Sequence, residues 1–195
     1  QLLVARNLAP MPYEHLRPHA SAGARGLLEG AFGITPDHAD FINLRDEFYL
    51  NYEKALLVDS KLFDGMSDLL EQMEAANIPW GIVTNKSERF TNPLTDLMGL
   101  RQRAISTVSG DTTPHAKPHP EPILHAARIA NIDPTKSIYV GDDIRDVLAG
   151  KAAGMKTVAA AYGYCGCKEP PEAWGADYIA NNPLDLLQII FPNKE

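Results

Sequence analysis

The first part of the chain has apolar side chains at helical spacing and no alternating pattern that would indicate a strand. Between residues 37 and 57 they recur every three or four positions, which predicts one long helix. Shorter helices are expected before it, separated by Pro and Gly residues, at 1–8, 13–17 and 22–32. We therefore expect residues 1–60 to form a small helical domain.

From about residue 61 the pattern changes to short apolar runs that alternate with amphipathic segments. The apolar runs predict strands at 78–84, 105–109, 137–140, 156–160 and 178–180. The amphipathic segments predict helices at 65–77, 87–100, 120–131, 142–154 and 183–190. Repeated strand–helix units with short connections imply a parallel sheet covered by helices on both faces. The predicted fold class of residues 61–195 is therefore α/β.

Composition narrows the possible partners. The chain has 195 residues, 45% of them hydrophobic and 22% charged, as is ordinary for a soluble globular protein. A net charge of −7 without any run of Lys or Arg argues against a nucleic-acid partner. No apolar stretch is long enough for a membrane span and no secretory signal is recognisable, so we expect no membrane partner and a cytoplasmic protein. Cys165 and Cys167 are then interpreted as reduced residues of a surface loop.

Three carboxylates follow one of the predicted buried strands. The apolar run 138–140 ends at Gly141, and Asp142, Asp143 and Asp146 come directly after it. In open parallel sheets, ligands bind outside the carboxyl ends of the strands. Helix capping would explain one Asp at this place, but not the cost of packing three together. Because carboxylate oxygens are the ligands that Mg²⁺ prefers, the sequence predicts a magnesium site here.

Two further segments place polar residues near the same edge. Thr84 and Asn85 end a predicted strand, where a hydroxyl and free backbone N–H groups suit a phosphate, although either residue could simply cap the next helix. Lys117 precedes a helix, and a site with carboxylates, Mg²⁺ and phosphate needs a fixed cation. A lone loop Lys is otherwise usually solvated. His115 and His119 flank Lys117, and without an apparent third ligand we interpret both as loop residues.

The motifs Thr84-Asn85, Lys117-Pro118 and Gly141-Asp142-Asp143-x-x-Asp146, in this order, resemble the haloacid dehalogenase superfamily of phosphatases. The resemblance covers essentially the whole chain, and the ordered set is far more specific than any one motif. The segments 61–66, 162–164 and 174–177 bring the chain closest to the phosphoglycolate phosphatase-like branch. Within that branch it is similar to bacterial N-acetylmuramic acid 6-phosphate phosphatases. The resemblance implies a Rossmann-like core over residues 61–195 and a helical cap over residues 1–60.

The resemblance also implies roles for the matching positions of the core. Thr84 would bind the transferring phosphoryl group, assisted by the backbone N–H of Asn85. Lys117 would neutralise the phosphate and the nucleophile. Asp142 would hold Mg²⁺, together with Asp143, which stands where many relatives have Ser.

Two more roles follow from the resemblance. Asp146 would orient Lys117 or the waters of the metal. In the cap, the segment 21–25 matches a loop that faces the active site, so Arg25 would recognise the carboxylate or sugar end of the substrate.

One part of the family pattern is missing from the sequence. The family's first motif is a strand that ends in Asp-x-Asp-Gly-Thr and supplies the nucleophile and the acid/base, but no Asp-x-Asp occurs here. Asp59 and Asp64 have no second Asp at the required spacing. We expect the missing strand to precede Gln1 and to lie mid-sheet, which would separate the strands before Thr84 and Gly141 by about 9–10 Å. The sequence is accordingly interpreted as a fragment with an N-terminally incomplete cap, inactive and unstable alone.

For the intact protein, the resemblance implies Mg²⁺-dependent hydrolysis of a small phosphorylated metabolite through an aspartyl-phosphate. Phosphoglycolate, N-acetylmuramic acid 6-phosphate or a broader set of phosphate esters are the candidate substrates. A phosphate- or Mg²⁺-binding protein without a nucleophile and a dehalogenase of the same superfamily are the alternatives. The sequence predicts no oligomeric state.

Overall fold

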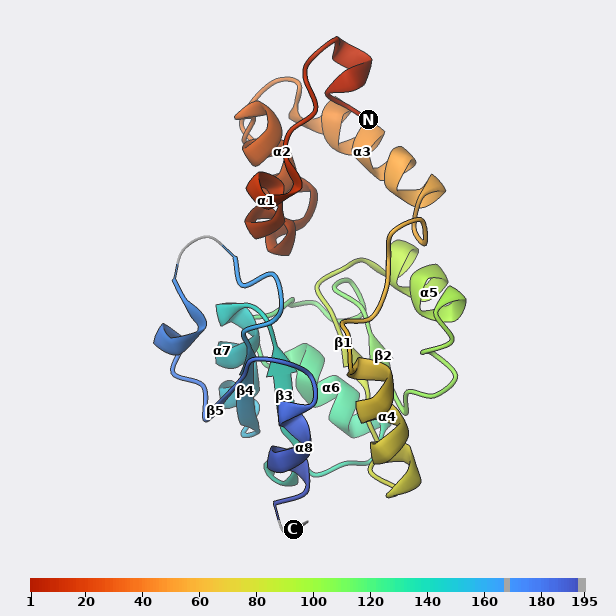
Figure 1. Cartoon of the computed structure of the whole chain (residues 1–195), viewed down its shortest axis with the longest axis vertical. Helices are drawn as coiled ribbons and strands as arrows, with labels where there is room; N and C mark the ends of the chain where they lie inside the picture. Colours follow the sequence, from red (N-terminus) through yellow and green to blue (C-terminus); the bar gives the residue numbers. More distant parts are fainter. Residues whose placement is uncertain (167–168, 193–195) are drawn as a thin grey trace.

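The computed structural model describes residues 1–166 and 169–192, and it shows a helical region beside a larger part that contains the strands (Figure 1). The helical region consists of α1 (Tyr13–Leu16), α2 (Gly23–Phe32) and α3 (Phe41–Lys54), with 3-10 helices at Val4–Arg6 and Arg17–Ala22. Leu28, Phe41 and Leu44 are buried together between α2 and α3. The helix predicted at 1–8 is only a 3-10 turn, because Asn7 adopts a left-handed conformation that ends it.

The remaining elements alternate between strand and helix, as predicted. They are α4 (Met66–Ala75), β1 (Ile82–Val83), α5 (Glu88–Leu97), β2 (Thr107–Val108), α6 (Glu121–Ile129), β3 (Ile138–Gly141), α7 (Ile144–Ala152), β4 (Lys156–Ala160), β5 (Tyr178–Ala180) and α8 (Asp185–Ile190). Each strand pair is parallel. The predicted α/β class is therefore confirmed.

The strands form two sheets and not the single sheet that was predicted. β1 pairs with β2, and β3 pairs with β4, which in turn pairs with β5. Within the described residues, no backbone ladder joins β1 to β3. Ile82 and Thr84 direct their backbone N–H groups to β2, so Val83 between them directs its own backbone groups away from β2, toward β3. Whether a further strand lies in this position stays a prediction.

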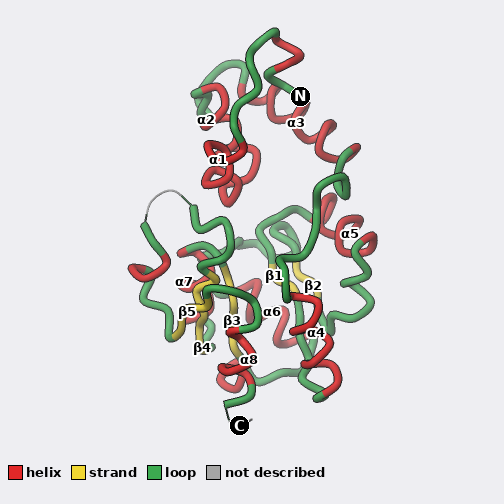
Figure 2. The backbone as a smooth tube through the Cα atoms, viewed as in Figure 1, coloured by secondary structure: helices red, strands yellow, loops and turns green. Residues whose placement is uncertain are grey.

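Helices pack on both faces of the three-stranded sheet, as Figure 2 also shows. On one face, α4 and α8 pack through Leu69, Met73 and Leu186 against Val158 of β4 and the partly buried Val140 of β3. On the other face, Ile123 of α6 and Ala149 of α7 pack against Tyr139 of β3. Because successive side chains of a strand point to opposite faces, Tyr139 and Val140 each enter a different core layer.

The helical region contacts the α/β part at two places. At the first, which we call the α3–α5 contact, the Tyr52 ring lies edge-on to Phe90 with 5.3 Å between centroids, and Lys86 Nζ donates to the Tyr52 hydroxyl at 2.5 Å. Arg89 and Glu53 form an ion pair beside it. At the second, Arg17 and Arg145 join the 3-10 helix Arg17–Ala22 to the α/β part.

Two expectations from the sequence concern the cysteines and the absence of a membrane span. Cys165 is a free thiol that lies 3.4 Å from the Ala161 carbonyl oxygen, whereas Cys167 lies outside the described residues. In the portion of the chain that the structure describes, every helix is too short or too polar to cross a membrane.

The first testable prediction concerns Asp177, which ties the chain before β5 to β4. Its Oδ2 accepts from the backbone N–H of Thr157 at 2.8 Å, and its Oδ1 pairs with Lys156 Nζ at 3.0 Å. The Thr157 backbone hydrogen bond, with those from Lys156 and the Thr157 hydroxyl, lowers the pKa of Asp177 to about 2. Because the folded state favours the ionised carboxylate, Asp177 stabilises the protein at pH values above its unfolded-state pKa near 4. This stabilisation is lost as the pH falls toward 2.

We therefore expect Asp177→Asn to lower the free energy of unfolding at pH 7 by about 1 kcal/mol, after allowance for solvent screening at this partly exposed position. The difference from wild type should shrink steadily between pH 4 and pH 2 in urea denaturation experiments. Asp64→Asn is the matched control, because the Asp64 side chain is fully exposed. A deficit that is equally large at pH 7 and pH 2.5 would contradict this role of the carboxylate.

Candidate active site

Lys117 lies at the centre of a buried polar network beside the carboxyl ends of β1 and β3. Its Nζ is 2.7 Å from Asp146 Oδ1 and donates to the Val83 carbonyl and the Tyr139 hydroxyl, both at 2.8 Å. The Lys117 and Asp146 side chains are only 9% and 10% exposed. Burying two charges is expensive unless they are paired and fully hydrogen-bonded, and here each N–H of the ammonium has an acceptor.

Tyr139 completes this network from the middle of β3. Its hydroxyl accepts from Lys117 and donates to the Val83 carbonyl at 3.1 Å. Burial, followed by the charges of Asp146 and Asp142, raises the pKa of Tyr139 well above its ordinary value, so the phenol stays protonated. The Val83 carbonyl, which points away from β2, is therefore satisfied by two side chains and not by a neighbouring strand.

The start of α7 places Asp146. Asp143 caps this helix by accepting from the Arg145 backbone N–H at 3.0 Å, which puts Asp146 in the first turn. There the Asp146 carboxyl packs on Gly141, where an added Cβ would lie 2.2 Å from the Asp146 Cβ. Burial raises the pKa of Asp146, and the neighbouring Lys117 opposes that shift.

Asp142 and Asp143 have different surroundings. Asp142 Oδ2 accepts from the Tyr164 backbone N–H at 2.8 Å, and no donor among residues 1–166 and 169–192 reaches Oδ1. Both oxygens of Asp143 accept from the Arg145 guanidinium, at 2.7 and 2.8 Å. Burial alone would raise the pKa of Asp143, but the hydrogen bonds from Arg145 outweigh it and lower that pKa.

These carboxylates fit Mg²⁺ by their chemistry, because both supply hard oxygen ligands. Asp142 has one oxygen available for a cation, whereas Asp143 is engaged by Arg145. Among the residues that the structure describes, no group of three acidic, His or Cys side chains is arranged as a complete metal site. The chain therefore offers Asp142 as a ligand, and most of a Mg²⁺ coordination sphere would have to come from water, phosphate or further groups.

Thr84 and Asn85 lie beside this network, at the end of β1. The Thr84 backbone N–H donates to the Val108 carbonyl at 2.9 Å, and its Oγ1 accepts from the Lys86 backbone N–H at 3.1 Å. The Asn85 side chain holds the backbone of Lys117 from both sides, donating to its carbonyl at 2.9 Å and accepting from its N–H at 3.0 Å. Sequence reasoning considered the backbone N–H of Asn85 and a helix cap, and it missed this clamp.

Six of the seven predicted site residues thus belong to connected segments near the carboxyl ends of β1 and β3, whereas Arg25 does not join them. Arg25 is exposed on α2, and no contact with the α/β part is recorded for it within the described residues. Three participants were missed: Tyr139, Arg17 and Arg145. An Arg two positions after a capping Asp is a usable signal for Arg145. Nothing in the sequence distinguishes Tyr139 from an ordinary strand aromatic or Arg17 from a surface Arg.

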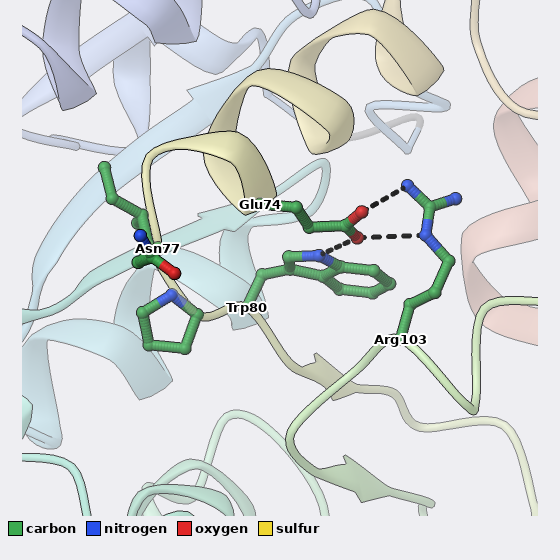
Figure 3. A pocket seen from close by; sticks show the side chains of 6 residues that line it. Glu74, Asn77, Trp80 and Arg103 are labelled. Atoms are coloured by element: carbon green, nitrogen blue, oxygen red, sulfur yellow. Dashed lines mark hydrogen bonds and ion pairs between the residues drawn. The ribbon is translucent and has the colours of Figure 1, made fainter.

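A pocket of about 240 Å³ lies elsewhere, at the opposite end of β1 (Figure 3). Glu74 is its central polar group, accepting from Trp80 Nε1 at 2.9 Å and from Arg103 Nε at 2.9 Å. It contains none of the predicted site residues. Ligands of parallel sheets bind at the carboxyl ends of strands, so this pocket is not the candidate active site.

Several known proteins are similar to this chain over nearly its full length. It is 39% identical over 189 residues to an N-acetylmuramic acid 6-phosphate phosphatase from Pseudomonas putida, covering 97% of this chain and 85% of that protein. It is 40% identical over 187 residues to a phosphoglycolate phosphatase from Xanthomonas campestris pv. campestris, covering 96% of this chain and 84% of the relative.

Solved structures share the fold. The crystal structure of a predicted phosphoglycolate phosphatase from Haemophilus somnus 129Pt superposes with a TM-score of 0.82 at 24% identity, covering 96% of this chain and 86% of that one. A haloacid dehalogenase-like hydrolase from Streptococcus pneumoniae superposes with a TM-score of 0.79 at 19% identity, covering 96% and 86%. A family model for haloacid dehalogenase-like hydrolases matches residues 4–160. With its α/β fold and its Lys117–Asp146 network, the chain belongs to the haloacid dehalogenase-like hydrolase family.

Proposed function

We propose that this protein is a Mg²⁺-dependent phosphatase that hydrolyses a small phosphorylated metabolite. The observation that carries the proposal is the buried Lys117–Asp146 pair, which adjoins Thr84 and Asp142 at the carboxyl edge of the strands. Relatives of this chain are named phosphoglycolate phosphatase and N-acetylmuramic acid 6-phosphate phosphatase. Both names denote phosphate esters of carboxylic acids, and these two esters are the candidate substrates.

In the proposed mechanism, each residue acts on the charge of the phosphoryl group. The Thr84 hydroxyl oxygen already accepts from Lys86 N–H, so its hydrogen is free to be donated to a phosphoryl oxygen. Lys117 neutralises negative charge on that group, while Asp146, Tyr139 and the Asn85 clamp hold it in place. Asp142 would hold Mg²⁺, which when bound would polarise a phosphoryl oxygen.

We further propose that the nucleophile belongs to a strand between β1 and β3, which the printed sequence does not contain. Two observations support this position: β1 and β3 lie in different sheets, and the Val83 backbone is directed away from β2. An Asp on that strand would attack phosphorus, the alkoxide would leave, and water would then cleave the aspartyl-phosphate. Residues 1–60 would act as a cap over a core of residues 61–195, and the 195 residues alone should be inactive.

The experiment that tests the function uses the full-length protein. Phosphoglycolate, N-acetylmuramic acid 6-phosphate and a panel of other phosphate esters are assayed with and without Mg²⁺. We expect hydrolysis of at least one of the two acids, and we expect it to be lost on removal of Mg²⁺. Absence of hydrolysis across the panel, or full activity without a divalent cation, would contradict the proposal.

Substitution of Asp142 tests the metal ligand. Asp142→Asn should lower kcat/KM by about 100-fold and raise the Mg²⁺ concentration needed for half-maximal rate, because a neutral amide binds Mg²⁺ more weakly than a carboxylate. Asp64→Asn serves as the control at an exposed position. If Asp142→Asn keeps wild-type turnover at low Mg²⁺, then Asp142 is not a ligand.

A further prediction concerns the stability of the Lys117–Asp146 pair. Lys117→Met should lower the free energy of unfolding by about 3 kcal/mol at pH 7, because it leaves the buried Asp146 carboxylate without its cation. The double variant Lys117→Met/Asp146→Asn should recover part of that loss, since no unpaired charge remains. Urea denaturation of the four proteins measures the coupling. If the losses of unfolding free energy in the two single variants simply add in the double variant, the Lys117–Asp146 interaction contributes nothing to stability.

A further inference from the structure

Arg17 differs from the other arginines of the described chain in its surroundings. The ion pairs at 4 Å or less engage Arg6, Arg45, Arg89, Arg101, Arg103 and Arg145. Of the three left without a carboxylate in the described residues, Arg25 and Arg128 are exposed, whereas Arg17 is half-buried. A half-buried guanidinium without a counter-charge is unfavourable, so Arg17 is placed to take an external anion.

The hydrogen bonds of Arg17 leave most of its donors available. Its Nη2 donates to the Gly163 carbonyl at 2.5 Å and to the Tyr162 carbonyl at 3.3 Å, and the guanidinium lies 5.3 Å from the centroid of the Tyr164 ring. These are neutral groups, which orient the guanidinium without neutralising it. Within the described residues, neither Nε nor Nη1 has a recorded acceptor. Nε and Nη1 can each therefore donate to an external anion such as a carboxylate.

Ser21, on the same 3-10 helix, provides a second and independent observation. Its Oγ is buried and makes no hydrogen bond, and no other buried side-chain N or O atom in the described residues is left in this state. A buried hydroxyl without a partner is unfavourable, because it has lost its hydrogen bonds to water. The backbone carbonyl of Ser21 accepts from Arg145 Nη2 at 2.7 Å, so the residue is held in place while its hydroxyl remains unsatisfied.

Both residues lie beside the proposed catalytic edge. Tyr164, whose ring is next to Arg17, donates its backbone N–H to Asp142, and an added Cβ on Gly163 would lie 2.2 Å from the Asp142 Cβ. Arg145 connects Ser21 to Asp143. In Figure 1, the segment that follows α1 lies on the side of the helical region that faces the α/β part. A phosphate ester bound beside Thr84 and Asp142 would thus have its other end toward Arg17 and Ser21.

We propose that Arg17 and Ser21 form the subsite that recognises a carboxylate on the substrate, with Arg17 as the specificity-determining residue. This inference rests on the proposed phosphatase function and adds to it the residues that would recognise the carboxylate of the candidate substrates. A second anion so close to Asp142, Asp143 and Asp146 would be repelled without its own cation. Arg17 provides that cation, whereas Arg25, for which the resemblance implied this role, is exposed.

The test compares esters that carry a carboxylate with counterparts that lack it, in the full-length enzyme with Mg²⁺. One pair is phosphoglycolate and ethyl phosphate; the other is N-acetylmuramic acid 6-phosphate and N-acetylglucosamine 6-phosphate. Arg17→Met should lower kcat/KM for the hydrolysed acid by about 100-fold and for its neutral counterpart by less than about 3-fold. Arg17→Lys should give an intermediate loss, because it keeps the charge but not the donor positions of the guanidinium. Ser21→Ala should lower kcat/KM for the acid alone.

Arg128→Met is the matched control, because Arg128 is an exposed Arg on α6 without a carboxylate partner in the described chain. It should change kcat/KM for neither ester. An equal loss on both esters would show that Arg17 only fastens the helical region to the segment 162–164, and the proposal would be wrong. The same conclusion follows if Arg17→Met changes neither ester or if Arg25→Met alone removes the preference for the acid. If the wild-type enzyme hydrolyses the neutral ester as well as the acid, the proposed subsite is wrong but the phosphatase function stands. If it hydrolyses none of the esters, both proposals are wrong.

Discussion

The buried contact between Lys117 and Asp146 is the interaction on which the rest of the site depends. It joins the loop before α6 to the first turn of α7 across the place where the two sheets approach, and it holds the Val83 carbonyl at the end of β1. Tyr139 adds a neutral donor to the same carbonyl. The side chains that would contact a phosphate are therefore fixed by the same contacts that hold the two sheets together.

Much of this arrangement could be predicted from the sequence, because the relevant signals are local. The apolar runs that end at Thr84 and Gly141 became β1 and β3, and the Asp residues after Gly141 lie at the start of α7, as predicted. The split of the strands into two sheets could not be read from periodicity, since pairing depends on which backbone edges meet. The long helix expected from residue 37 begins at Phe41 because residues 36–40 form turns and a bend.

The contacts between distant segments were the hardest part to predict. The sequence shows that Arg17 and Arg25 are both in the helical region, but only the structure shows that Arg17 reaches the Gly163 carbonyl. The Asn85 side chain and the Lys117 backbone are 32 positions apart, and their reciprocal hydrogen bonds follow from the folding of two loops together. Such contacts leave no periodic trace in the sequence, because each depends on a partner far along the chain.

Two separate regions supply the side chains discussed above. Loops and helix starts of the α/β part supply Asn85, Lys117, Asp142 and Asp146. A 3-10 helix of the helical region supplies Arg17 and Ser21. Only a few hydrogen bonds, mainly those of Arg17 and Arg145, connect this 3-10 helix to the loops below it. Substitutions in residues 17–22 can therefore accumulate without disturbing the Lys117 network. During divergence, drift in this single short segment would alter what lies above the loops, while the Lys117 network is inherited unchanged.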